Sequence, residues 1–334
     1  MSVRRLSIMS IKRKAWSVMA DRIDRMGDKF AYKSASELFR DEELLACMAN
    51  LFARESGIRL PEKSMISRSA IDRLKERGWI TAKGRLADKT AAYSCYEYVR
   101  QLYRTEPLDQ LLIEEADGRR RIADICCGGG ATILALLKAE RRERVCGIDA
   151  ASGQIELLRE LLEIEAYGER VYTSIAGTTA YAVDSAADGQ RIETHIGDVH
   201  RLPWPEESFD LVICRASLHY LDIKRSIAEM YRVLEPGGKL YLLVHGPGYP
   251  FDYLVRRRGI WSRDMAAYAL RKLRAGWGTK PDPGLSQGRY LRRRQVESLL
   301  LESGFESMRY YMDEDRMIAG RWPVYFAIVA EKRG

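Results

Sequence analysis

The sequence lacks the long apolar runs that membrane insertion or secretion would need. None of its 334 residues belongs to an uninterrupted apolar stretch near the ~20 residues of a membrane-spanning helix. The first 20 residues carry five Lys or Arg residues but no continuous apolar core of the secretory type. These absences predict a cytoplasmic protein without a membrane span.

Residues that form disulfides or bind zinc are also scarce. The six cysteines contain no C-x-x-C pair, and none of the four histidines has ligand spacing to a cysteine. A chain of this length with so few cysteines does not need a disulfide scaffold to fold. We therefore expect no metal site and no disulfide framework.

Positive charge is present but is confined to one segment. Between Pro250 and Gln295 there are twelve Lys or Arg residues and three Asp, whereas the whole chain has a net charge of +8. The segment is therefore +9 and the rest of the chain about −1. A local excess of this kind predicts either an exposed, solvated face or an anionic partner.

Residues 1–119 are expected to be mainly helical. One face of a helix is formed by apolar residues at i, i+3, i+4 and i+7, namely Leu45, Met48, Ala49 and Phe52. A helix over Ser69–Arg77 and two short strands, Trp79–Thr81 and Arg85–Ala87, follow. Two interpretations stay open: a helical cap or dimerisation region, and a winged-helix-like part near residues 65–90.

From about residue 120 short apolar strands alternate with helices. The expected strands are Arg121–Cys126, Arg144–Asp149, Ile192–Ile196, Phe209–Arg215 and Lys239–His245, and the helices between them are Ala131–Ala139, Gly153–Glu165 and Ile223–Leu234. This alternation predicts an α/β fold in which helices cover both faces of a parallel sheet.

The end of the chain does not follow this alternation of strands and helices. A helix over Gln295–Ser303 precedes two strands, Phe305–Met312 and Pro323–Glu331, whose connection is too short for a parallel crossover. We therefore expect a doubly wound, Rossmann-like, seven-stranded sheet with an antiparallel last strand, in a domain spanning residues 120–334. The basic segment, at about 246–288, follows the fifth strand and is expected to form a lid over the ligand crevice.

The strongest motif is a strand that runs through Asp124 into a glycine loop, Gly128–Gly130, and then into a helix. Asp149 ends the next strand, where an acidic residue can accept hydrogen bonds from both ribose hydroxyls of a nucleoside. Ile133 replaces the third glycine of a dinucleotide fingerprint, and the Lys of a phosphate-binding Walker loop is missing. The pattern favours a nucleoside ligand without phosphates, and the alternative is a plain tight turn.

Further segments follow in order: Gly197-Asp198-Val199, Leu202-Pro203, Ser208-Phe209-Asp210-Leu211-Val212 and Pro236-Gly237-Gly238. With the glycine loop, they make residues 121–244 resemble the class I S-adenosylmethionine (SAM)-dependent methyltransferases. The resemblance is strongest to the branch with the ubiquinone and menaquinone biosynthesis enzymes and many natural-product methyltransferases. The N-terminal third carries no such resemblance.

The resemblance implies a role for each matching residue. Asp124 would lie beneath the SAM amino group, Gly128 and Gly130 would shape the methionine pocket, and Asp149 would bind the ribose. Further members of the implied cofactor site are Asp198 at the adenine N6 group, Val199 through its backbone N–H, and Arg215 on the methionine side.

Two positions depart from the family pattern. Cys126 stands where the first loop glycine is usual, and a positive φ there would strain it. Ala150, next to the ribose-binding position, is smaller than usual, so adenine stacking on that side should be thin.

In this family the acceptor meets the cofactor near the ends of the fourth and fifth strands. His219 and His245 fall there and are candidate general bases; the alternative is that they only order the loop, with catalysis by proximity. Tyr93, Tyr96 and Tyr98 are candidates for an aromatic wall over the site, and the alternative is that they pack in the core.

We expect a small-molecule acceptor, and the arginines at 256–258 favour one that is anionic or amphipathic. The rival interpretations are an RNA or protein methyltransferase that uses the basic segment, and a non-catalytic, SAM-binding DNA regulator.

Overall fold

A computed structural model describes residues 32–58, 66–102, 106–164, 169–175, 178–185, 190–257, 266–267, 269–270, 273 and 290–334. Its helices are α2 (Tyr32–Phe39), α3 (Glu42–Glu55), α4 (Arg68–Glu76), α5 (Lys89–Leu102), α6 (Pro107–Glu115), α7 (Ala131–Ala139), α8 (Ser152–Ile164), α9 (Ile223–Val233), α10 (Tyr249–Val255) and α12 (Arg293–Glu302). Its strands are β1 (Arg121–Ile125), β2 (Arg144–Asp149), β3 (Glu169–Ile175), β4 (Thr178–Ser185), β5 (Gln190–Ile196), β6 (Phe209–Arg215), β7 (Leu234–His245), β8 (Phe305–Met312), β9 (Met317–Ile318), β10 (Trp322–Pro323) and β11 (Tyr325–Lys332).

The main sheet has the order β3-β4-β5-β2-β1-β6-β7-β11-β8. Strands β5, β2, β1, β6 and β7 are parallel, and β11 runs antiparallel to both β7 and β8. The seven predicted strands are all present, and the expected antiparallel end is confirmed. The predicted fold class is therefore correct.

The sheet also contains a hairpin that the sequence analysis did not assign. Strands β3 and β4 pair antiparallel with each other, and β4 pairs antiparallel with β5. The hairpin extends the sheet from seven strands to nine at the edge beside β5. It lies between α8 and β5, where the predicted alternation of strand and helix has no place for a hairpin.

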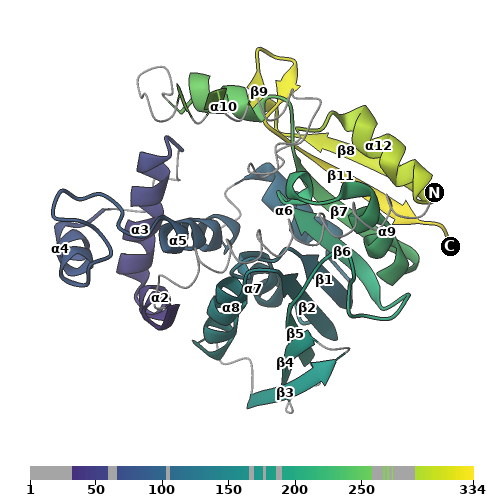
Figure 1. The fold of residues 1–334 in the computed structure, drawn as a ribbon, viewed down its shortest axis with the longest axis horizontal. Coiled ribbons are helices and arrows are strands. Elements are labelled where there is room, and N and C mark those ends of the chain that lie inside the picture. Colours follow the sequence, from purple (N-terminus) through teal and green to yellow (C-terminus); the bar gives the residue numbers. More distant parts are fainter. Residues whose placement is uncertain are drawn as a thin grey trace, which may run out of the picture.

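Both faces of the central strands are buried, and side chains that alternate along each strand enter two different core clusters. Ile122 of β1 and Tyr241 of β7 share one core cluster with Leu112 of α6. Their neighbours Ala123 and Leu240 belong to a second cluster, which includes residues of α9 and α12. Figure 1 shows α9 and α12 on one side of the sheet and α7 and α8 on the other.

The N-terminal helices pack on the second of these sides. Helix α2 contacts α8, and α5 contacts α7, so the helical region shares a core with the glycine-loop half of the sheet. Side-chain caps begin two of these helices: Asp41 accepts a hydrogen bond from Leu44 N, and Ser67 accepts one from Ala70 N. Figure 1 shows α3, α4 and α5 standing beside the sheet.

The region near residues 65–90 consists of α4 and a single antiparallel bridge between Ile80 and Leu86. The winged-helix interpretation stays a prediction. Helix α10 is the described start of the basic segment, and most of residues 258–289 lie outside the described residues. In the described ranges, no helix has the length and apolar character that crossing a membrane requires.

Candidate active site

A cavity of about 520 Å³ lies at the carboxyl ends of β1, β2, β6 and β7. The glycine loop forms one end of it, and α5, α10 and the connection between β8 and β11 provide the other walls. Of the residues that the resemblance marked for the cofactor, the cavity lining contains Asp124, Cys126, Gly128, Asp149 and Arg215. Gly130, Ala150, Asp198 and Val199 lie outside the lining.

The glycine loop is built from left-handed backbone conformations. Cys126, Gly128 and Gly130 have φ values of 60°, 53° and 77°. The expected strain at Cys126 is thus present, because a side chain costs about 1–2 kcal/mol in this conformation. Gly130 cannot carry one at all without movement, since a Cβ there would lie 2.1 Å from Cδ1 of Leu158.

Asp149 ties this loop to the end of β2. Its two carboxylate oxygens accept hydrogen bonds from Gly128 N and Ala151 N, both at 2.9 Å. Burial raises the pKa of the Asp149 carboxyl, although the backbone N–H groups lower it. Each oxygen can accept further hydrogen bonds, so the carboxylate that shapes the loop can also accept the ribose hydroxyls of a nucleoside.

Asp124, near the end of β1, is a buried carboxyl with an unpartnered oxygen. Its side chain is 2% exposed, and its Oδ2 has no hydrogen-bond partner in the described structure. Burial raises the pKa of Asp124 to about 7, against the opposing effect of Arg215. An unpaired carboxylate in this place suits an ammonium group, which the methionine part of SAM carries.

The ionisation of Asp124 should therefore control cofactor affinity. We expect SAM to bind about tenfold more tightly at pH values well above 7 than well below, because only the carboxylate can pair with the ammonium. Asp124→Asn should abolish this rise, and calorimetric titrations across the range would measure both proteins. A wild-type affinity that is independent of pH would contradict the role.

The raised pKa of Asp124 should also make the folding stability depend on pH. The unfolded chain releases the Asp124 proton near its ordinary pKa of 3.8, whereas the folded protein holds it up to about 7. Stability should therefore fall as pH rises between these values. In Asp124→Asn that part of the pH dependence should disappear, which denaturant titrations can measure.

His219 and His245 meet at the ends of β6 and β7, as expected from their positions. Nδ1 of His245 lies 3.2 Å from Nε2 of His219, so the two rings can share one N–H. His245 lines the cavity and stacks on Tyr249 with ring centroids 4.0 Å apart. His219 is 3% exposed and lies behind His245, outside the cavity lining.

Asp198, which the resemblance places at the adenine N6 group, lies outside the cavity lining and pairs with a histidine, and its role at the adenine stays a prediction. Its Oδ1 lies 2.5 Å from Nδ1 of His200, and Nε2 of His200 accepts the backbone N–H of Asp222, the residue that caps α9, at 3.0 Å. Burial raises the pKa of Asp198, but the hydrogen bonds from His200 outweigh it and the pKa is lowered. This chain of bonds fixes the loop after β5 to the start of α9.

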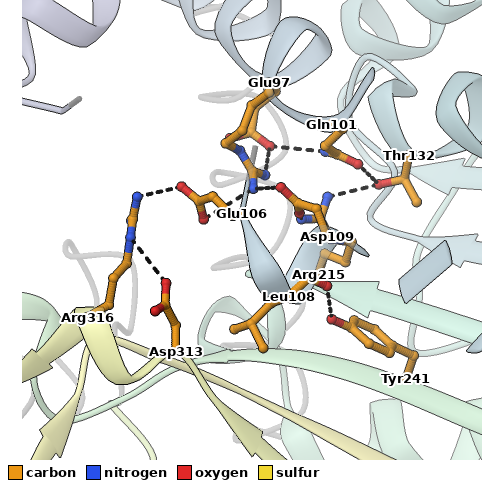
Figure 2. A network of polar contacts seen from close by, with 11 residues as sticks. Glu97, Gln101, Glu106, Leu108, Asp109, Thr132, Arg215, Tyr241, Asp313 and Arg316 are labelled. Atoms are coloured by element: carbon orange, nitrogen blue, oxygen red, sulfur yellow. Dashed lines mark hydrogen bonds and ion pairs between the residues drawn. The ribbon is translucent and has the colours of Figure 1, made fainter. Parts of the chain in front are cut away.

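A buried ionic network that the sequence analysis missed forms one wall of the cavity (Figure 2). Arg100 of α5 pairs with Glu97, Glu106 and Asp109. Asp109 of α6 also pairs with Arg215 at the end of β6, and Glu106 pairs with Arg316 from the connection between β8 and β11. No local pattern could reveal the whole network, since its members come from three distant parts of the chain, residues 97–109, Arg215 and Arg316.

Tyrosines make up a large part of the cavity lining. The expected Tyr93, Tyr96 and Tyr98 of α5 all line the cavity. Further tyrosines that the sequence analysis did not single out for the site also line it: Tyr220, Tyr249, Tyr253 and Tyr325. The cavity therefore joins a polar, carboxylate-bearing end to an aromatic one. In the described ranges, no group of three or more His, Cys, Asp or Glu residues could hold a metal ion.

Comparison with known proteins agrees with the expected chemistry. Residues 123–242 match a family model described as a methyltransferase domain. The uncharacterized methyltransferase YcgJ of Bacillus subtilis is 28% identical over 138 residues, which cover 40% of this chain and 45% of that protein. A demethylmenaquinone methyltransferase of Deinococcus radiodurans is 29% identical over 133 residues, which cover 40% of this chain and 46% of that protein.

The chain thus spans slightly less than half the length of these curated relatives. The crystal structure of YcgJ superposes with a TM-score of 0.42 and 18% identity, over 71% of this chain and 99% of that one. The sheet order, the glycine loop with Asp149 and the matching family model agree with one another. Residues 123–242 therefore form a methyltransferase domain, similar to those of class I SAM-dependent methyltransferases.

Proposed function

We propose that this protein transfers the methyl group of SAM to a small-molecule acceptor. The observation that carries the proposal is the cavity of about 520 Å³ that joins the glycine loop and Asp149 to a tyrosine-lined end. Its volume falls in the range of roughly 300–1,000 Å³ that is usual for small-molecule sites.

The polar end of the cavity fits SAM. Asp149 can hold the ribose, the backbone of the glycine loop can lie against the cofactor, and the unpartnered oxygen of Asp124 can pair with the ammonium group. SAM supplies a methyl group activated by its sulfonium. The task of the protein is to hold the nucleophilic atom of the acceptor in line with it, ~3–3.5 Å away.

The aromatic end of the cavity supports an acceptor with an apolar, ring-bearing body. Tyr249 and Tyr325 present ring faces close to His245, and Tyr96 approaches from α5. One relative of the chain is named as a demethylmenaquinone methyltransferase, a name that also points to a ring-bearing acceptor. Stacking between rings is worth about 0.5–1.5 kcal/mol beyond simple burial.

We further propose that His245 accepts a proton when the acceptor is a hydroxyl group, with His219 orienting its ring. His245→Ala should then lower kcat by about 10²–10⁴ while leaving SAM affinity unchanged. His219→Asn should cost less and should shift the pH profile of kcat, because it changes the N–H shared at 3.2 Å. A loss below about fivefold in His245→Ala at every pH would leave proximity as the mechanism.

The acceptor itself can be found by an untargeted search. Extracts incubated with the purified full-length protein and SAM should contain a small molecule that gains one methyl group, and Asp149→Ala protein should not produce it. Transfer of labelled methyl to RNA or protein, with none to small molecules, would instead favour the polymer-modifying rival.

A further inference from the structure

Arg257, just after α10, is an arginine buried against the cavity. It is 6% exposed and lines the cavity beside Tyr253 and Tyr249. Its guanidinium carbon lies 4.2 Å from the ring centroid of Tyr253 and 5.8 Å from that of Tyr249. The backbone of Gly57, at the end of α3, packs so closely that a Cβ there would lie 2.8 Å from Cα of Arg257. The arginine is therefore held in place from two sides.

The guanidinium of Arg257 has donors left over. Its single ion pair joins Nε to Oδ2 of Asp252, at 2.7 Å. A guanidinium carries five N–H donors, and in the described part of the chain its two terminal nitrogens have neither an acceptor nor an ion-pair partner. By contrast, the cavity arginine Arg100 contacts three carboxylates, and Arg316 contacts two.

The Arg257 guanidinium lies near His245, the residue proposed to accept the proton of the acceptor. The ring of Tyr249 stacks on His245, and its centroid lies 5.8 Å from the Arg257 guanidinium carbon. Arg257 therefore lies one ring away from His245 along the cavity wall. A ligand cation is disfavoured here, because the faces of Tyr253 and Tyr249 already hold the protein's own cation.

Not all arginines of the 256–258 run share this role. Arg256 is exposed, and its Nη2 donates to the backbone oxygen of Met317 at 2.7 Å. Arg258 lies outside the described residues. The expectation of an anionic acceptor was based on all three arginines. Among those that the structure describes, only Arg257 supports it.

We propose that the two terminal nitrogens of Arg257 bind an oxyanion of the acceptor, a carboxylate or a phosphate. The planar guanidinium presents paired donors that match either group, which a lysine cannot copy. Glu106 and Asp109, two carboxylates of the ionic network, are each bound to an arginine, so they leave this donor pair to the ligand. The acceptor would then be an amphipathic acid with its ring among the tyrosines. This inference rests on the proposed function.

The test uses the full-length chain saturated with S-adenosylhomocysteine, the unreactive product of the cofactor. The probes are 3-phenylpropionate and benzoate, each with its matched amide, and phenyl phosphate with phenol as its neutral match. We expect one class of anion to bind at least tenfold more tightly than its neutral match, measured by calorimetry. Arg257→Gln and Arg257→Lys should remove that preference, whereas Arg256→Gln should keep it.

The possible outcomes distinguish a failure of the oxyanion site at Arg257 from a failure of the proposed methyltransferase function. A preference for the carboxylates identifies the acceptor group as a carboxylate, and a preference for phenyl phosphate identifies a phosphate. If no anion binds more tightly than its neutral match, or if Arg257→Gln retains the preference, the oxyanion site is refuted. Unchanged affinity of Arg257→Gln for S-adenosylhomocysteine shows that the variant is folded. Failure of the wild-type protein to bind S-adenosylhomocysteine would refute the proposed function instead.

Discussion

Replacing Asp149 with alanine should weaken SAM binding by at least about a hundredfold, which corresponds to about 2.7 kcal/mol or more. The carboxylate lines the cavity and already holds Gly128 N and Ala151 N at 2.9 Å. Its loss would remove two charge-assisted hydrogen bonds to the ribose, each worth about 1.5–3 kcal/mol. It would also release the glycine loop from the end of β2.

Calorimetry can measure this loss, and Asp149→Asn serves as a matched variant. The amide keeps the size of the side chain and one acceptor oxygen, so its affinity should fall between those of the wild type and Asp149→Ala. Thermal melting without ligand would show whether the loop change also affects the fold. An Asp149→Ala protein that binds SAM as tightly as the wild type would refute the assignment of the ribose site.

Asp109→Ala should lower the free energy of unfolding by about 3–5 kcal/mol. Asp109 is 4% exposed, and its two oxygens pair separately with Arg100 and Arg215, as Figure 2 shows. In the described part of the chain it is the only carboxylate paired with Arg215. Removing it would leave that arginine buried with an uncompensated charge beside the cavity.

Asp72→Ala is the matched control for this prediction. Asp72 pairs with Lys75 on the surface of α4 at 3.6 Å, and its side chain is 58% exposed. Exposed pairs of this kind contribute about 0–1 kcal/mol. Denaturant titrations should therefore show a much larger loss of unfolding free energy in Asp109→Ala than in Asp72→Ala. A loss of less than about 1 kcal/mol in Asp109→Ala would show that the buried network adds little to stability.

Several features of the site could be predicted because they are local. The turn from β1 through Gly128 to α7, and the place of Asp149 at the end of β2, depend on short-range patterns of apolar residues and glycines. The antiparallel pairing of β8 and β11 could be predicted from the short connection between them. Even the strain at Cys126 could be anticipated, because the loop conformation belongs to the position and not to the residue.

Other features depend on which side of an element faces the cavity. Arg256 and Arg257 are neighbours in the same basic run, yet one is exposed and the other is 6% exposed beneath a tyrosine cluster. Likewise His245 lines the cavity while His219 lies behind it, because the short 3₁₀ turn Leu218–Tyr220 sets where that ring points. Periodicity alone does not set these orientations at the ends of elements.

The sequence by itself determined the α/β class, the antiparallel end of the sheet, and the glycine-loop turn with Asp149 at the end of the next strand. All three depend on patterns within about 30 residues, the length of one strand–helix–strand unit. Only the tertiary structure decided the acceptor end. It brings α5 and α6, α10 and the connection between β8 and β11 around one cavity, so that Arg100, Arg257 and Arg316 become its charged walls. The physical reason is that burial and ion pairing between distant segments depend on packing, which a one-dimensional pattern does not record.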